Sequence, residues 1–122
     1  MQPDIFIGTD IVDVSRIRQL IDDHSDRFIE RTYTDKEQSY CAGKSDPAVH
    51  YSGRFAAKEA IKKALMTSGI TDPISWVEME IVPDHNGAPI VNLHGNLFAN
   101  LDCKVSISHT QDTAIATAVI IK

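Results

Sequence analysis

The amino-acid sequence predicts an α+β fold, in which an antiparallel sheet packs against one long central helix and the chain closes with a β-hairpin. Three observations support this prediction. Residues 5–12 form a short apolar run, which is typical of a strand. Residues 54–67 carry apolar side chains at helical spacing. Residues 104–108 and 114–121 alternate between apolar and polar side chains, as strands with one buried face do.

Length and composition predict one soluble unit. A chain of 122 residues with 43% hydrophobic residues has the usual size of a single domain. No repeat or linker divides it, so we expect one domain over residues 1–122. The sequence has no secretory signal and no apolar run of about 20 residues, so we expect no membrane contact and a cytoplasmic location. Cys41 and Cys103 are expected to be reduced, packed thiols.

The net charge limits the classes of partner that the protein can bind. Twelve Lys and Arg against 17 Asp and Glu leave a charge of −5. Because nucleic-acid binding requires a basic surface, we expect no nucleic-acid partner. An acidic protein partner would have to bind at a local basic patch.

The first half of the chain reads as a strand followed by helices. Gly8 within the strand suggests a turn or a close backbone approach. Asp13 or Ser15 could cap a helix that extends to about residue 21. Two more short helices are expected at 27–31 and 34–40. In the second of these, Thr34 and Glu37 have the spacing of a capping box.

A loop is expected at 42–52, before the strongest helix. That helix has an apolar ridge and ends at Gly69; the ridge comprises Ala57, Ile61, Ala64 and Leu65. Strands at 76–82 and 89–93 then flank Asn86-Gly87, a strong reversal signal. A short helical piece is expected at 96–101.

Two carboxylates are candidates for chemistry. Asp10 ends an apolar strand, where its charge is costly unless a cation or hydrogen bonds offset it. The simpler alternative is that it caps a turn. Glu59 lies opposite the apolar ridge of its helix, yet its neighbours on that side include Phe55 and Met66. It therefore either faces a cleft or interface, or forms an i,i+4 surface pair with Lys63.

Four cations follow the same helix: Arg54, Lys58, Lys62 and Lys63. They could form a solvated face or a wall that binds anions. Carboxylates beside a phosphate-binding lysine row require a divalent cation between them. Mg²⁺ commonly takes one or two protein carboxylates together with substrate phosphates and water.

Ser106, Ser108 and His109 do not form a nucleophile–base pair, because the side chains of sequence neighbours on a strand diverge. Ser106 and Ser108 share a face and, with His109, could donate hydrogen bonds to a phosphate. His109 could also be a local hydrogen-bonding residue.

Taken together, four motifs resemble those of the holo-acyl carrier protein synthases, which are 4'-phosphopantetheinyl transferases. The matching segments occur in family order over nearly the whole chain: Ile7-Gly8-Thr9-Asp10-Ile11-Val12 with Arg16-Ile17, Gly53-Arg54-Phe55-Ala56-Ala57-Lys58-Glu59-Ala60 with Lys63-Ala64, Asn86-Gly87-Ala88-Pro89, and Val105-Ser106-Ile107-Ser108-His109-Thr110. Any one of these motifs is weak, but four in register are specific.

The resemblance implies a 4'-phosphopantetheinyl transferase-like fold and a role for each matching residue. Asp10 and Glu59 would be the Mg²⁺ ligands, and Lys63 would contact the coenzyme A phosphates and assist catalysis. The phosphate and nucleotide site would comprise Arg54, Lys58, Ser106, Ser108 and His109, with Gly87 and Pro89 near the adenine. The surface that docks the acidic carrier would comprise Arg16, Arg27, Phe28 and Arg31. Family members are typically homotrimers with active sites between protomers.

The implied reaction moves the phosphopantetheine of coenzyme A onto a serine of an apo acyl carrier protein and releases 3',5'-ADP. Either Glu59 or a metal-bound water could accept the serine proton. The carrier could serve fatty-acid synthesis or a related polyketide-type pathway. The acidic stretch 22–26 on the docking helix bears on that choice. Two other functions stay open: a non-catalytic module that binds coenzyme A or the carrier, and a metal-dependent hydrolase of coenzyme A-like pyrophosphates.

Overall fold

The fold is built on a three-stranded antiparallel sheet with the strand order β1-β5-β4. The computed structural model describes residues 2–122, apart from the side chain of Ser25. Its elements are β1 (Ile5–Asp13), α1 (Val14–Thr32), α2 (Asp35–Ala42), α3 (Pro47–Thr67), η1 (Trp76–Glu78), β2 (Met79–Pro83), β3 (Pro89–Leu93), η2 (Asn96–Phe98), β4 (Asp102–His109) and β5 (Thr113–Ile121). Strands β4 and β5 form the expected C-terminal hairpin, so the predicted fold class is confirmed.

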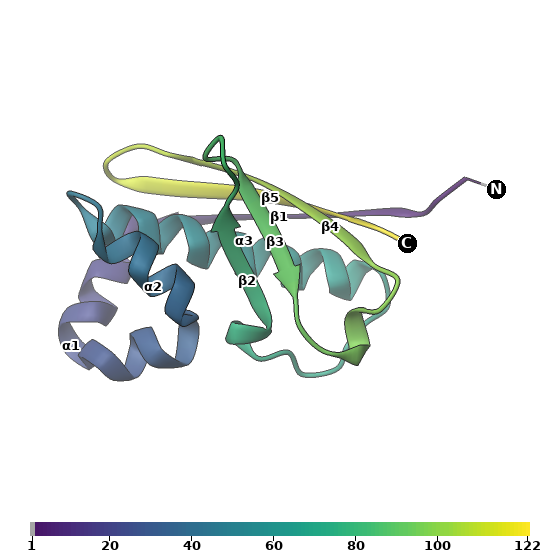
Figure 1. Ribbon diagram of the computed structural model, residues 1–122, viewed down its shortest axis with the longest axis horizontal. Coiled ribbons are helices and arrows are strands. Elements are labelled where there is room, and N and C mark those ends of the chain that lie inside the picture. The colour runs from purple at the N-terminus through teal and green to yellow at the C-terminus, as the bar shows by residue number, and fades with distance from the viewer. Residues whose placement is uncertain (1) are drawn as a thin grey trace.

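Helix α3 is the central element, and it lies along one face of this sheet (Figure 1). The predicted ridge on α3 is fully buried, with Ile61 and Leu65 among its members. Gly8 allows β1 to pack closely against α3, because a Cβ at that position would overlap the carbonyl oxygen of Ala60. The expected close backbone approach is thus confirmed, and it draws β1 directly onto α3.

Helices α1 and α2 gather at one end of the molecule, and the β2–β3 hairpin crosses α3 on the side away from β1 (Figure 1). The capping box predicted for α2 is present: Glu37 N–H donates to Thr34 Oγ1 at 3.3 Å, and Thr34 N–H donates to Glu37 Oε1 at 2.9 Å. Gly87 has φ +87° in the β2–β3 turn, as the Asn86-Gly87 signal predicts.

Several element boundaries differ from the predictions: η2 ends at Phe98 and β4 already begins at Asp102, and three differences are larger. Helix α1 is one helix over Val14–Thr32 instead of two short ones. The loop expected at 42–52 is wrong from Pro47 onward, because proline fits the first helical turn and α3 begins there. The strand expected from residue 76 begins with the 3-10 turn η1, and β2 follows from Met79.

Candidate active site

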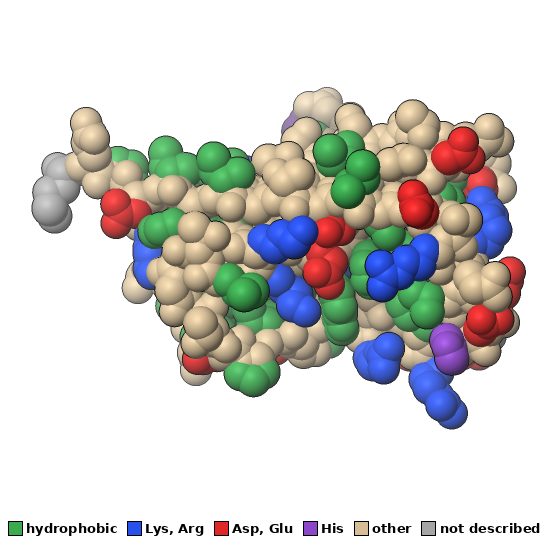
Figure 2. All heavy atoms as spheres, turned by 180° about the vertical axis from the view of Figure 1, so that it is seen from behind, with side chains coloured by type: hydrophobic (Ala, Val, Ile, Leu, Met, Phe, Trp, Pro, Cys, Tyr) green, Lys and Arg blue, Asp and Glu red, His purple; other side chains and the backbone are tan. Residues whose placement is uncertain are grey.

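Asp10 and Glu59 line the same small pocket. On β1 the even-numbered residues face α3, so Asp10 follows Gly8 on the inner side of the strand. The pocket, of about 130 Å³, lies between β1 and α3, and Arg16 and Phe55 also line it. Figure 2 shows acidic and basic side chains gathered in the middle of this face of the molecule. Two residues 49 positions apart in sequence thus reach one cavity.

Lys63 completes this group. Its Nζ donates to Asp10 Oδ1 at 3.1 Å and to the carbonyl oxygen of Thr9 at 3.0 Å. Its side chain remains 52% exposed. Among the described residues, the Glu59 carboxylate accepts no hydrogen bond and has no ion pair, so the alternative of an i,i+4 pair between Glu59 and Lys63 is wrong. The half-exposed Lys63 side chain therefore joins Asp10 at the edge of the pocket that the two carboxylates line.

The donor chemistry of this pocket fits Mg²⁺. Carboxylate oxygens are hard ligands, and Mg²⁺ usually binds one or two of them and completes its octahedron with substrate and water oxygens. Lys63 occupies one oxygen of Asp10, which leaves the second Asp10 oxygen and both Glu59 oxygens for a cation. Within residues 2–122, His, Cys, Asp and Glu side chains do not gather in groups of three or more around a possible metal position.

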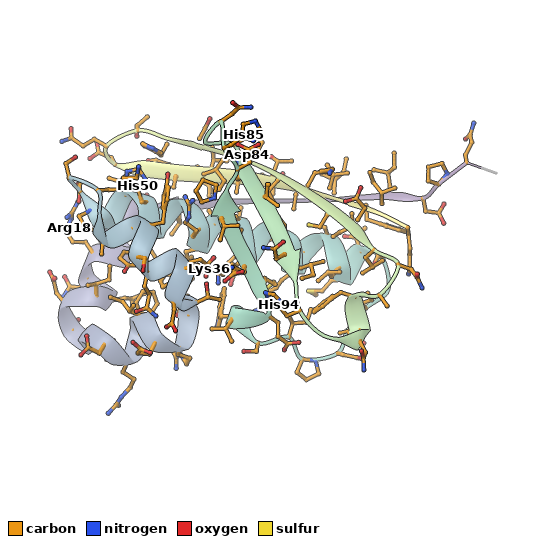
Figure 3. All side chains as sticks on the ribbon, in the orientation of Figure 1. Arg18, Lys36, His50, Asp84, His85 and His94 are labelled. Atoms are coloured by element: carbon orange, nitrogen blue, oxygen red, sulfur yellow. The ribbon has the colours of Figure 1, made fainter. Side chains whose placement is uncertain are left out.

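A second polar group surrounds the N-terminal half of α3. The Arg54 guanidinium lies over the Tyr40 ring at 4.0 Å, and Lys44 Nζ lies 4.5 Å from the centre of the same ring. The His50 ring lies 5.8 Å from that of Tyr40 and 5.6 Å from that of His109. We call these five residues the cationic cluster. Figure 3 shows its His50 near the start of α3, beside the β4–β5 turn.

The cationic cluster has the character of an anion site. Arg54 is only 6% exposed, and within the described part of the chain its buried Nε has no hydrogen-bond partner. Burial lowers the pKa of His50, and the nearby charges of His109, Lys44 and Arg54 lower it further. The protonated form of His50 is disfavoured here, and the buried Arg54 Nε donor is unpaired. Both features indicate that the cluster would be stabilised by a bound anion.

The two groups lie on different sides of α3. Five residues separate Arg54 from Glu59, which places them about 140° apart around the helix axis. The structure therefore brings Asp10, Glu59 and Lys63 together, and separately brings Arg54 to His109. Within one chain it does not bring these two sets to a common pocket.

Lys58 does not belong to either group, and its predicted role at the phosphate site is wrong. Its side chain is fully buried. Its Nζ donates to Glu37 Oε1 at 2.7 Å and to the carbonyl oxygens of Thr32 and Trp76 at 2.8 and 2.9 Å. All three of its protons bind protein oxygens, so none is available to a ligand.

Phe28 is likewise wrong as a docking residue. It is 4% exposed and packs edge-on against Tyr33, with ring centres 5.9 Å apart. The reason is its position on the inner face of α1. Arg16, Arg27 and Arg31 are exposed on that helix, as a docking surface requires.

The remaining predicted residues lie on strands and turns. Ser106 and Ser108 are exposed on one face of β4 and line a shallow pocket of about 130 Å³ with Ile115 and Thr117 of β5. Gly87 and Pro89 lie at the β2–β3 turn. The turn also carries Asp84 and His85, which Figure 3 labels.

Sequence reasoning missed three members of the cationic cluster: Tyr40, Lys44 and His50. Lys44 and His50 stood in the segment expected to be a loop. Recognising Pro47 as a helix start would have placed His50 one helical turn before Arg54, on the same face of α3. Tyr40 had no local signal, because only the packing of α2 against α3 brings it there.

The comparisons with known proteins agree with this geometry. The family model described as "4'-phosphopantetheinyl transferase superfamily" matches residues 6–118. A holo-[acyl-carrier-protein] synthase of Protochlamydia amoebophila is 45% identical, and the match covers 93% of this chain and 94% of that protein. One of Chlamydia pneumoniae is 42% identical, with 94% and 95% covered.

Solved structures give the same result. A holo-(acyl-carrier-protein) synthase from Bacillus anthracis in complex with CoA (3',5'-ADP) matches with a TM-score of 0.83 and 32% identity, over 99% of both chains. One from Helicobacter pylori in complex with coenzyme A matches with a TM-score of 0.82 and 32% identity, over 93% of this chain and 98% of that one. In residues 2–122, none of the helices has the length and apolar composition needed to cross a bilayer. The chain belongs to the 4'-phosphopantetheinyl transferase superfamily, among the holo-[acyl-carrier-protein] synthases.

Proposed function

We propose that this chain transfers the 4'-phosphopantetheine group of coenzyme A to a serine of an apo acyl carrier protein. The observation that carries the proposal is the pocket shared by Asp10 and Glu59, with Lys63 hydrogen-bonded to Asp10. The family membership supports the same reaction.

In this reaction the serine oxygen attacks the β-phosphorus of coenzyme A. The bond from that phosphorus to the oxygen it shares with the α-phosphorus breaks, and 3',5'-ADP leaves. The serine proton passes to a base. Negative charge grows on the leaving oxygen, so a cation held in advance at that oxygen lowers the barrier. Lys63 fits this role, because two hydrogen bonds to β1 orient its half-exposed ammonium group.

Asp10 and Glu59 would hold a Mg²⁺ ion in the shared pocket. When bound, Mg²⁺ supplies a Lewis acid for the diphosphate oxygens. The protein's own contribution is positional. Gly8 allows β1 to lie directly on α3, and this contact sets Asp10 opposite Glu59.

The cationic cluster is proposed to bind the phosphate and nucleotide end of coenzyme A. Its members Arg54 and His109 would share this role with Gly87 and Pro89 of the family motifs. Ser106 and Ser108 lie on the outer face of the sheet beside Ile115, so they would reach coenzyme A from the interface between copies. Because Arg54 and Glu59 project from different sides of α3, we propose that one molecule of coenzyme A bridges two copies of the chain. One copy would supply the carboxylates and its neighbour the cationic cluster.

The outer face of the sheet supports such an assembly. Ile5, Ile7 and Ile11 are 59%, 59% and 67% exposed, and Ile11 pairs with Ile115, which is 39% exposed. Apolar side chains exposed side by side mark an interaction surface. We propose that three copies associate through this face in a homotrimer, which sedimentation at several protein concentrations would test. A monomer at working concentration would contradict it.

The arginines of α1 are proposed to dock the acidic carrier. Arg16 lines the Asp10–Glu59 pocket, and Arg27 and Arg31 continue the same stripe along the helix. Asp22, Asp26 and Glu30 form a stripe centred about 100° away around the axis. Of the acidic stretch 22–26, only Asp23 lies on the arginine stripe, one turn before Arg27, so it reduces the positive charge of the docking surface without removing it. We place the enzyme in the cytoplasm with such carriers.

The decisive test incubates the protein with coenzyme A, Mg²⁺ and a panel of apo acyl carrier proteins. Mass spectrometry should show a carrier heavier by one phosphopantetheine group. Asp10→Ala and Glu59→Ala should each reduce the rate by about 10³-fold, because metal coordination supplies several kcal/mol of charge stabilisation. Circular dichroism should show that both variants stay folded.

Other outcomes of this assay separate the remaining functions. Release of 3',5'-ADP without any carrier would indicate a hydrolase. Binding of the carrier or coenzyme A without turnover would indicate a binding module. Unchanged transfer by both carboxylate variants would contradict the proposal.

The bridged site has its own test, which mixes two inactive variants. Glu59→Ala trimers and Arg54→Ala trimers are unfolded and refolded together at equal amounts. If each site takes Glu59 from one copy and Arg54 from the next, one of the three sites in every mixed trimer is intact, which is about a quarter of all sites after random assembly, and activity returns. Sites contained within one copy would stay inactive.

A further inference from the structure

An ion pair ties helix α1 to the start of α3. Arg18 lies on α1, and Asp46 is the N-cap residue of α3. Arg18 Nη1 donates to Asp46 Oδ1 at 3.2 Å, and Arg18 Nη2 donates to Asp46 Oδ2 at 3.1 Å. The contact is therefore bidentate, which fixes the relative orientation of the two groups better than a single hydrogen bond does. Figure 3 shows Arg18 and His50 at the same end of the molecule.

Arg18 does not belong to the arginine stripe that is proposed to dock the carrier. At about 100° per residue, it lies roughly 180–220° around α1 from Arg16, Arg27 and Arg31. One side of α1 thus carries the stripe, and the opposite side carries the arginine that binds the start of α3.

The two elements that the pair joins leave a groove between them. It has a volume of about 340 Å³, and its lining includes Ile21 of α1, Tyr51 of α3 and both members of the ion pair. Helix α1 also packs against the start of α3 through a separate small cluster around Val14. Because the ion pair bridges the groove, it helps to set where the first turn of α3 lies relative to α1.

Asp46 stands between two members of the cationic cluster. Lys44 precedes it by two residues, and His50 follows it by four, about one helical turn along α3. The Lys44 N–H donates to the carbonyl oxygen of Cys41 at 3.1 Å, and the Val49 N–H donates to the carbonyl oxygen of Asp46 at 3.2 Å. A shift of Asp46 would therefore move the segment that carries both Lys44 and His50.

The charge of Asp46 is unfavourable for an anion site. Burial lowers the pKa of His50, and the Asp46 charge opposes this effect, so the carboxylate acts electrostatically on the cationic cluster. The same charge would repel a bound phosphate. An acidic residue at this position therefore needs another role, and its bidentate contact with Arg18 indicates what that role is.

We propose that Arg18 and Asp46 are positioning residues that hold Lys44 and His50 in place for the phosphates of coenzyme A. Arg18 acts through Asp46, and Asp46 acts through the backbone on either side of it. The proposal rests on the function proposed above for the cationic cluster.

The test measures the Kd of 3',5'-ADP by calorimetry on the full chain. Arg18→Met and Asp46→Asn should each weaken binding about fivefold, since an ion pair whose side chains are 48% and 40% exposed supplies at most about 1 kcal/mol. The double variant should bind about as tightly as either single variant, because all three lack the same contact. The kcat of transfer at saturating coenzyme A should stay at the wild-type value, because neither residue lines the Asp10–Glu59 pocket.

Asp46→Asn is the most informative variant, because charge and position predict opposite results. If only its charge mattered, removing this carboxylate would strengthen the binding of a phosphate. If Asp46 holds the segment in place, the same change weakens binding. Asp22→Asn is the matched control: it removes an equal charge from the same groove, keeps the bidentate contact and should not weaken binding. Arg18→Lys keeps the charge but lacks the planar fork, so it should recover only part of the affinity.

The results separate this proposal from the function on which it rests. Unchanged or tighter binding by Asp46→Asn would overturn the positioning role. So would a double variant in which the two losses multiply, or a loss confined to kcat. In each of these cases the wild-type protein still binds 3',5'-ADP and modifies a carrier. Failure of the proposed function would instead appear as a wild-type protein that does neither.

Discussion

Lys58 and Lys63 occupy the same helix, five residues apart, and have opposite environments. Lys58 is fully buried, and its ammonium donates to Glu37 and two carbonyl oxygens. Lys63 is half exposed, and its ammonium donates to Asp10 and Thr9 at the edge of the candidate active-site pocket. One lysine joins four parts of the fold, and the other lies at the proposed site of reaction.

A cation-rich helix can therefore serve structure and chemistry at once. Lys58 ties α3 to the end of α1, to α2 and to η1, and its partner Glu37 also accepts from the Ile81 N–H of β2 at 2.9 Å. Removing Lys58 should therefore reduce the stability of the fold, whereas removing Lys63 should reduce the rate of transfer. The two lysine variants below test this contrast, and the smaller effects expected of His50 come after them.

Lys58→Met should cost about 3–5 kcal/mol of unfolding free energy, because it leaves the buried Glu37 carboxylate without its counter-charge. Urea denaturation at a fixed protein concentration measures this loss. Lys36→Met, on the exposed side of α2, is the control and should change the unfolding free energy by less than about 0.5 kcal/mol. A Lys58→Met protein as stable as the wild type would show that the pair is dispensable.

Lys63→Met should have the reverse pattern. The kcat of transfer should fall about 10²-fold, since one charge aimed at the leaving oxygen is lost. The unfolding free energy should change by only about 1–2 kcal/mol, because Lys63 is 52% exposed although its partner Asp10 is 16% exposed. Lys63→Arg, which keeps the charge, should recover part of the rate. A loss of stability equal to that of Lys58→Met would erase the contrast between the two lysines.

The smallest effect concerns His50 in the cationic cluster. Its pKa is lowered by burial and by neighbouring charges, so it gains its proton only when the pH falls below the usual range of histidine. Binding of 3',5'-ADP should strengthen by about fivefold as His50 becomes charged, the effect of one unit charge about 4 Å away in a solvated site. Calorimetry from pH 7.5 to 5.5 measures it, and His50→Gln should show a flatter profile.

The same shift has a consequence for stability. Between the lowered pKa and the ordinary value of 6.5, the unfolded chain binds a proton that the folded chain does not. Stability should therefore rise with pH across that window, and His50→Gln should remove this part of the slope. Parallel profiles for both proteins would show that His50 does not titrate as proposed.

Much of the fold could be predicted from local patterns. The apolar ridge of α3, the alternation in β4 and β5, and the Thr34–Glu37 capping box all reflect interactions within a few residues. The boundary of α1 could not be found in this way, because the polar stretch 22–26 gives no apolar period. Tertiary packing carries the helix through it, with Phe28 anchored against Tyr33 and Phe55.

The residues of the candidate site were likewise only partly predictable from the sequence. Motif order identified Asp10, Glu59 and Lys63, and the structure places all three together. Motif order did not distinguish Lys58 from Lys63, because the sequence does not show which residues will surround a lysine in the folded chain. The same limit applies to Phe28, whose aromatic ring fits a docking surface as well as a core.

By itself, the sequence determined which elements form and which residue types recur at family spacing, because hydrophobic period, caps and turns act over short distances. Only the tertiary structure decided which charges are buried and which meet. Burial and pairing depend on segments far apart in the chain: β1 against α3 for Lys63, and α2 with η1 for Lys58. An ammonium group enclosed by three oxygens and one open to solvent are the same residue until the chain has folded around them.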